Sequence, residues 1–340
     1  MSTLVWQIRS RAALLFEPAL GWTLVFVLGF VAAVLLATMR GAVDLPIGAL
    51  FASLFEQAHP FHGVVWDVRL PRAACAALVG MDLALAGALL QTAVRNPLAD
   101  PGILGVTAGA GVGALIVILF LPERASLAPW TAFGGGLAAI GTIVLLVWSK
   151  PGQTGALRIV LSGVALQAVL FALIALLTFA FADRAPAFAA FMVGSLNGTG
   201  WSDAARMLAP TLLGLVGIAL SRRTLDVLLL DDGAAGGLGV SVLQARFAAA
   251  VLAALLTAAA VSAAGLVGFV GLVVPNGLRL LVGPDHAALL PISALGGAAL
   301  VLIADTLART SLAPLELPVG ALLALVGGPY FLFILWKKLP

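Results

Sequence analysis

The stretch RLPRAACAALVGMDLALAGALLQTAVRNPLADPGILGVTAGAGVGA, residues 69–114, decides the fold class. Its first half is almost wholly apolar around Asp82, and it reaches a polar turn, RNPLADP, before a second apolar run begins. A transmembrane helix needs roughly 20 apolar residues to cross the hydrocarbon core of a bilayer. The stretch therefore predicts two membrane-spanning helices, over about 66–93 and 102–121, joined by a short turn.

The composition of the whole chain extends this pattern. Of the 340 residues, 62% are hydrophobic and only 10% are charged, and the mean hydropathy is +1.15. Soluble domains carry about 25% charged residues, because their surfaces must be solvated. A chain so poor in charge cannot cover a water-facing surface, so we expect an all-α polytopic membrane protein.

Ten apolar stretches are candidate spans. The run AAGLVGFVGLVVPNGLR is divided near Ala263–Leu266, because it contains several glycines and a proline. The first span, Leu20–Thr38, is expected to be a retained helix rather than a cleaved signal peptide. The predicted spans are about 20–39, 66–93, 102–121, 129–149, 156–181, 205–221, 241–262, 266–281, 289–309 and 317–336.

Ten spans place both termini on one side of the membrane. If that side is cytoplasmic, eleven of the 18 Lys and Arg residues fall inside, in agreement with the positive-inside rule. The connecting segments are short, so a single transmembrane domain over residues 1–340 is predicted. The longest inside segment, about 222–246, is amphipathic and interrupted by glycines, which favours a pair of short helices along the membrane surface.

Sequence motifs of enzymes are missing from the chain. It contains no Walker A loop, HExxH, CxxC or GxSxG. The run from Gly109 to Gly113 faintly resembles a phosphate loop, but it lies inside an apolar span, where glycines allow close helix packing. The single cysteine, Cys75, is expected to be an inert packing residue, and His59, His62 and His286 are expected in loops. We therefore expect no enzyme and no metal site.

Several blocks together resemble one family. Residues 69–114, the block GFVGLVVPNGLRLLVGPDHAALLPISALGGAALVLIADTLAR at 268–309 and the block ELPVGALLALVGGPYFLFIL at 316–335 resemble the permeases of iron-siderophore, haem and cobalamin ABC importers. The resemblance runs in order along nearly the whole chain. It implies the type II importer fold, with ten helices per subunit.

The resemblance also implies the partners. Such a permease pairs with a second permease subunit, most simply as a homodimer, in the inner membrane of a bacterium. Two cytoplasmic subunits bind ATP and Mg and drive transport, so the permease itself carries no cofactor. A periplasmic binding protein delivers the substrate.

The resemblance also implies roles for residues on the periplasmic and cytoplasmic sides of the membrane. Arginines on the periplasmic rim of such permeases pair with glutamates of the binding protein, and the matching residues here are Arg69, Arg72 and Arg309. A planar guanidinium suits carboxylate recognition. On the cytoplasmic side, about 226–240 matches the coupling helices that dock on the ATPase. The residues assigned to coupling are Leu228, Leu229, Leu230, Asp231, Asp232, Gly237 and Gly239.

The cytoplasmic gate follows from the same resemblance. Asn96 and Leu98, in the turn after the second span, match one gate element of the family. Ala156 and Leu157 match the other, where some relatives carry small hydroxyl residues, so this second gate is expected to be more apolar here.

Two positions depart from the family pattern. Asn276 stands where many members have histidine, and Asp82 stands where relatives have a small apolar residue. A buried carboxylate is costly unless it is paired, neutral or hydrated. Asp82 is therefore expected either to face a water-filled pathway, where it would influence substrate preference, or to be held by a neighbouring polar group.

The substrate remains open between three chelates. An iron-siderophore complex is the first expectation, because most of the family carries one, and haem and cobalamin follow. Two other classes stay as alternatives. An ion-coupled secondary carrier would need no ATPase, and a membrane-embedded enzyme would need catalytic groups clustered at one depth.

Overall fold

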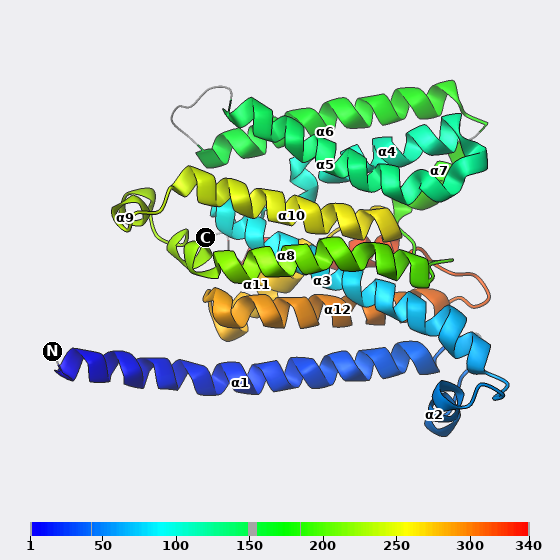
Figure 1. Cartoon of the computed structure of the whole chain (residues 1–340), viewed down its shortest axis with the longest axis horizontal. Coiled ribbons are helices and arrows are strands. Elements are labelled where there is room, and N and C mark those ends of the chain that lie inside the picture. Colours follow the sequence, from blue (N-terminus) through cyan, green and yellow to red (C-terminus); the bar gives the residue numbers. More distant parts are fainter. Residues whose placement is uncertain (1, 42, 149–154, 184, 339–340) are drawn as a thin grey trace.

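The computed structural model describes residues 2–41, 43–148, 155–183 and 185–338, which form helices and the turns between them. Figure 1 shows most of the helices running along the long axis of the molecule. The elements, in chain order, are α1 (Ser2–Met39), α2 (Ile47–Phe55), the π-helix η1 (Val64–Arg69), α3 (Leu70–Val94), the 3-10 turn η2 (Pro101–Leu104), α4 (Val106–Phe120), the 3-10 turn η3 (Pro122–Leu127), α5 (Ala128–Trp148), α6 (Gly155–Ala180), α7 (Ala185–Val193), α8 (Trp201–Val227), α9 (Asp232–Gly237), α10 (Val242–Ala264), α11 (Val270–Val282), α12 (His286–Thr310) and α13 (Val319–Lys338).

Each predicted span falls on a helix, which confirms the all-α polytopic fold. Seven helices among the described residues are long and apolar enough to cross a membrane. The predicted spans at 102–121, 266–281 and 317–336 coincide with the shorter apolar helices α4, α11 and α13. At 1.5 Å per residue α11 is about 20 Å long, which is less than the hydrocarbon thickness of about 30 Å. The count of ten crossings therefore stays a prediction.

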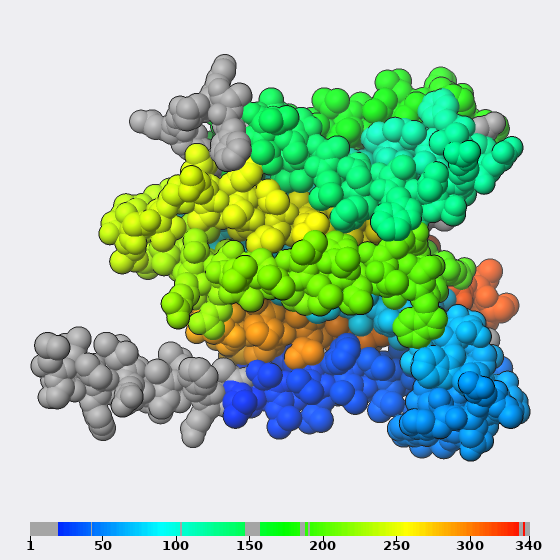
Figure 2. Space-filling view, in the orientation of Figure 1, coloured from blue at the N-terminus to red at the C-terminus, as the bar shows by residue number. Residues whose placement is uncertain are grey.

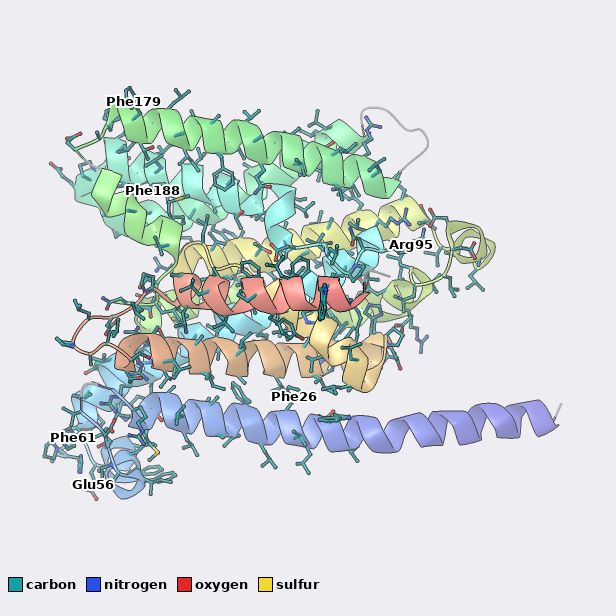
Figure 3. The ribbon with its side chains drawn as sticks, turned by 180° about the vertical axis from the view of Figure 1, so that it is seen from behind. Phe26, Glu56, Phe61, Arg95, Phe179 and Phe188 are labelled. Carbon is teal, nitrogen blue, oxygen red and sulfur yellow. The ribbon has the colours of Figure 1, made fainter. Side chains whose placement is uncertain are left out.

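The two ends of the bundle differ in what they carry. At one end lie α9, the start of α1 and the end of α13, and at the other lie α2 and η1 (Figure 1). We call these the α9 end and the α2 end. Figure 3, seen from behind, places Arg95 at the α9 end and both Glu56 and Phe61 at the α2 end. The chain thus begins its first helix and finishes its last at the same end of the bundle.

Helix α3 forms the centre of the bundle. It contacts α8, α10, α11 and α12, and most of its residues are buried. In the space-filling view, α8 and α10 cover most of the middle of α3, whereas the start of α3 is visible at the end of the molecule near α2 (Figure 2). By contrast, α1 exposes leucines such as Leu20, Leu24 and Leu28, which suit contact with lipid.

Glycines bring α3 into backbone contact with its neighbours. A Cβ atom on Gly80 would collide with the carbonyl of Gly297 in α12, and one on Gly87 would collide with the carbonyl of Gly271 in α11. Without a hydrophobic driving force between helices in lipid, such close approach of small residues supplies much of the attraction.

A second glycine contact joins α4 to α5. Gly109 and Gly113 lie against the backbone of Gly135 and Thr131, so that a Cβ atom at either position would meet a carbonyl oxygen. The prediction that the glycines from 109 to 113 serve helix packing is confirmed.

The chain is not helical between α10 and α11, as the division near Ala263–Leu266 predicted. Gly265 and Phe269 both have φ of 68°, and Gly265 ends α10. The freed backbone groups are bonded to other segments, since Leu266 N donates to Phe191 O at 3.0 Å and Ser195 N donates to Ala264 O at 2.8 Å. Irregular backbone at membrane depth is tolerated only where it is satisfied in this way.

Candidate functional site

The three arginines expected to dock a binding protein lie together at the α2 end, but each has partners within the chain. Arg69 is buried at the end of η1. Its Nη1 donates to the carbonyls of Thr38 and Met39 at 2.8 and 2.9 Å, and its Nη2 donates to Val43 O. The contacts with Thr38 and Met39 satisfy carbonyl groups at the end of α1, which have no partner within the helix.

Arg72 and Arg309 share a buried carboxylate. Arg72 holds Asp305 of α12 through Nε and Nη2, both at 2.9 Å, and reaches Glu316 with Nη1 at 2.9 Å. Arg309 Nε lies 3.7 Å from Asp305, and its Nη2 donates to Ala37 O. Partners within the chain thus hold Arg69 and Arg72, whereas Arg309 Nε is buried with no hydrogen-bond partner among the described residues. The docking role of the three arginines stays a prediction.

The carboxylates of this cluster were not among the residues singled out from the sequence. Asp305 lies in the motif ADTLAR, in which the sequence assigned a role to Arg309 alone. Its spacing of four residues from Arg309 in ADTLAR was the available signal, because residues i and i+4 face each other on a helix. Glu316 belongs to the turn before α13, and no spacing links it to Arg72.

The coupling segment forms a projecting turn at the α9 end. Leu228 is buried, whereas Leu229 and Leu230 are 40% and 44% exposed. Asp231 caps α9, since its Oδ1 accepts a hydrogen bond from Ala234 N at 2.9 Å. Gly239, with φ of 80°, lies in the turn toward α10. The exposed leucines beside a capped, charged turn are suited to docking, which stays a prediction.

The expected pair of short helices over 222–246 is wrong. Helix α8 continues to Val227 and α10 begins at Val242, so the connection is shorter than predicted and contains only α9. Leu225 is buried on the extended part of α8, which keeps this stretch packed against the bundle instead of lying along a membrane surface.

The first gate pair lies in the turn after α3. Asn96 Oδ1 accepts a hydrogen bond from Leu98 N at 2.9 Å, which closes a local Asx turn, and both residues are exposed. Asn276 of α11 donates from Nδ2 to Pro97 O at 2.6 Å. The residue that departs from the family pattern therefore supports this turn.

The second gate pair lies at the start of α6. Leu157 is 58% exposed, and the side chain of Ala156 lies outside the described residues. The gating role of both pairs stays a prediction.

Asp82 is fully buried on α3 and is held by one polar group. Thr211 Oγ1 of α8 donates to its Oδ2 at 2.8 Å, and its Oδ1 has no hydrogen-bond partner among the described residues. Of the two arrangements expected for this carboxyl, the structure therefore provides the neighbouring hydroxyl. Its influence on a substrate pathway stays a prediction.

The Asp82–Thr211 contact can be tested through stability. Thr211→Val leaves Asp82 buried without a partner, so we expect a loss of about 1–3 kcal/mol, seen as a lower thermal unfolding midpoint in detergent micelles. Thr211→Ser is the matched control, because it keeps the hydroxyl. Equal midpoints for the Val and Ser variants would show that the hydrogen bond does not stabilise the fold.

The histidines differ from the expectation of three loop residues. His286 is instead the first residue of α12 and is buried. Its Nδ1 lies 2.7 Å from Asp226 Oδ1, and its Nε2 lies 2.8 Å from Thr92 Oγ1. His59 lies in the turn after α2, and His62 lies in the helical turn that leads into η1; both contact Ser53. Among the residues with defined placement, no group of three His, Cys, Asp or Glu side chains is arranged to hold a metal ion.

The chain matches the family model of the FecCD transport family over residues 29–337. It belongs to the FecCD transport family. It is 44% identical over 285 residues to the hemin transport system permease protein HmuU of Yersinia pestis, across 81% of this chain and 84% of the relative. It is 40% identical over 303 residues to the Fe(3+) dicitrate transport system permease protein FecD of Escherichia coli, across 88% and 93%.

Other FecCD relatives extend the range of cargo and support the fold. The cobalamin import system permease protein BtuC of Halobacterium salinarum is 41% identical over 273 residues, across 80% of this chain and 73% of the relative. A solved transporter, described as of the metal-chelate ABC type in an inward-facing conformation, superposes with a TM-score of 0.83 at 31% identity. The superposition covers 93% of this chain and 98% of that chain.

Family membership and the apolar helices together define the molecular class. Proteins of the FecCD family are transport permease subunits, and this chain is a multi-pass membrane protein with their fold. The resemblance seen in the sequence to ABC importer permeases for metal chelates is confirmed.

Proposed function

We propose that this chain is the permease of an ATP-driven importer that carries iron-siderophore complexes across a bacterial inner membrane. It would work as half of a permease dimer, with two ATP-hydrolysing subunits at the α9 end and a periplasmic binding protein at the α2 end. The observation that carries this proposal is the match of fold and sequence to ABC importer permeases along almost the entire chain. This orientation makes the α9 end cytoplasmic.

The choice of an iron-siderophore complex rests on the cargo for which the similar permeases are named. The similar permeases include proteins named for ferric citrate, iron(3+)-hydroxamate and siderophore transport. No metal-binding cluster occurs in the described part of the chain, which suits a preformed chelate that is never ligated by the permease. Haem is the second candidate, favoured by the 44% identity to a hemin permease.

Reconstitution with the partner subunits tests both the class and the cargo. We expect a binding protein loaded with a ferric siderophore to raise the rate of ATP hydrolysis and to deliver iron into proteoliposomes. Haem-loaded and cobalamin-loaded binding proteins serve as comparison. Stimulation by haem alone would replace the proposed cargo with haem. Accumulation that follows an ion gradient in the absence of an ATPase subunit would contradict the importer class.

A further inference from the structure

The last turn of α3 is tied at two points to residues that flank α9. One tie starts from Arg95, which directly follows α3, and the other from Thr92, which lies in its final turn. The turn with Asn96 and Leu98 begins immediately after these two residues. Whatever shifts the segment around α9 therefore acts on the residues next to this turn.

The first tie is an ion pair across the turn. Arg95 Nη1 donates to Leu230 O at 3.0 Å, and its Nη2 pairs with Asp232 at the start of α9. Asp232 is also held by Arg246 of α10, with Nη2 at 2.8 Å from Oδ1. Figure 3 shows Arg95 lying beside α9 and the adjacent end of α10. One carboxylate thus links the ends of α3 and α10 to the projecting helix.

The left-handed backbone conformation of Arg95 indicates that its side chain has a function. Arg95 has φ of 50° and ψ of 39°, in the left-handed region that closes the C-terminus of many helices. Glycine is the residue that usually occupies this position, because an L side chain is disfavoured there. An unfavourable conformation that persists is a reason to look for function in the side chain.

The second tie passes through the buried histidine. Asp226, near the end of α8, lies 2.7 Å from His286 Nδ1 and accepts a hydrogen bond from His286 N at 3.2 Å. The opposite ring nitrogen lies 2.8 Å from the hydroxyl of Thr92. Because a ring nitrogen that faces a carboxylate has its orientation fixed by that contact, the imidazole spans α8, α12 and α3 in one defined position.

From these two ties we infer that Arg95 and His286 are positioning residues that transmit movement of α9 to the gate turn at Asn96 and Leu98. The inference rests on the proposed function, in which α9 docks on the ATPase. An ion pair as exposed as Arg95–Asp232 adds little to stability, so a role in holding the fold together does not account for it. Two connections, one at the first residue of α9 and one at the end of α8 just before it, convert its displacement into displacement of the turn.

Replacement of Arg95 by glycine separates transmission from folding. Arg95→Gly suits the left-handed backbone, so the variant is expected to accumulate, bind the ATPase subunit and hydrolyse ATP. We expect the amount of substrate imported per ATP hydrolysed to fall by about fivefold or more, a size typical of coupling between two sites. Arg222→Gln, which alters an exposed arginine of α8, is expected to keep the wild-type ratio.

The second tie is tested with a matched pair on α12. His286→Gln removes the imidazole that bridges Asp226 and Thr92 and is expected to lower the same import ratio. Asp285→Asn, one residue earlier, keeps the helix cap that Asp285 provides to Ala287 N and is expected to leave the ratio unchanged.

The outcomes separate the inference from the function on which it rests. A wild-type import ratio in Arg95→Gly would overturn the transmission role. If Arg95→Gly and Asp232→Asn both failed to accumulate, the pair would be a folding element and the inference would be wrong. A wild-type chain that does not bind an ATPase subunit would instead contradict the proposed function itself.

Discussion

Gly87→Leu is expected to prevent the folded chain from accumulating in the membrane. Gly87 lies against the backbone of Gly271, and a Cβ atom there would collide with a carbonyl group of α11. The position of a Cβ atom is fixed by the backbone, so no rotamer change relieves its clash with the carbonyl group. Helices α3 and α11 would therefore have to separate. Overpacking in a well-packed core typically costs about 1–3 kcal/mol and occasionally more, and we expect this site to exceed that range.

The measurement is the yield and monodispersity of the detergent-solubilised chain on size-exclusion chromatography. Gly134→Leu is the matched control, since Gly134 is also in a helix but has nothing within 4 Å of a built Cβ atom. We expect the control to behave like the wild type. Similar elution profiles for the two variants would show that the contact between α3 and α11 can accommodate a larger side chain.

Arg72→Glu is expected to be the most damaging charge substitution at the α2 end. It would place a third carboxylate beside Asp305 and Glu316, and would remove the arginine that forms an ion pair with each of them. Breaking a buried pair by losing one partner costs about 3–5 kcal/mol, because the other charge stays buried and uncompensated. The expected result is a strongly lowered unfolding midpoint or no folded protein.

An exposed ion pair provides the control for Arg72. Arg40 pairs with Asp44 with side chains 59% and 56% exposed, so Arg40→Glu is expected to change the midpoint little. Equal midpoints for the two variants would contradict the structural role of the Arg72 cluster. A loss of binding-protein docking in Arg72→Glu would not by itself identify a docking residue, because the fold fails first.

The sequence predicts the helices of this protein well because membrane spans are set by local composition. The positions of the apolar runs and of the break near Gly265 depend on neighbouring residues, and the structure has helices and a break at these positions. The role of the glycines from 109 to 113 can likewise be predicted from the sequence, since small residues in an apolar span commonly allow close helix packing.

Contacts between distant segments account for what the sequence did not predict. Arg72 and Asp305 are 233 residues apart, and Arg95 and Asp232 are 137 apart, so no local pattern links them. His286 follows a Gly-Pro-Asp turn that suggests a solvated loop, and only the packing of α12 against α3 and α8 buries it. The internal partners of the rim arginines were missed for the same reason.

The glycine contacts of α3 also determine which pieces of the molecule can move independently. A helix whose backbone lies against the backbone of its neighbour cannot slide along it, because its carbonyl groups would collide with the opposing chain. Helices α3, α11 and α12 therefore behave as one rigid body, and α4 and α5 as another. Helix α10 contacts both α3 and α5, so it lies at the boundary between these two groups of helices, and any movement of one group relative to the other is expected to involve its contacts.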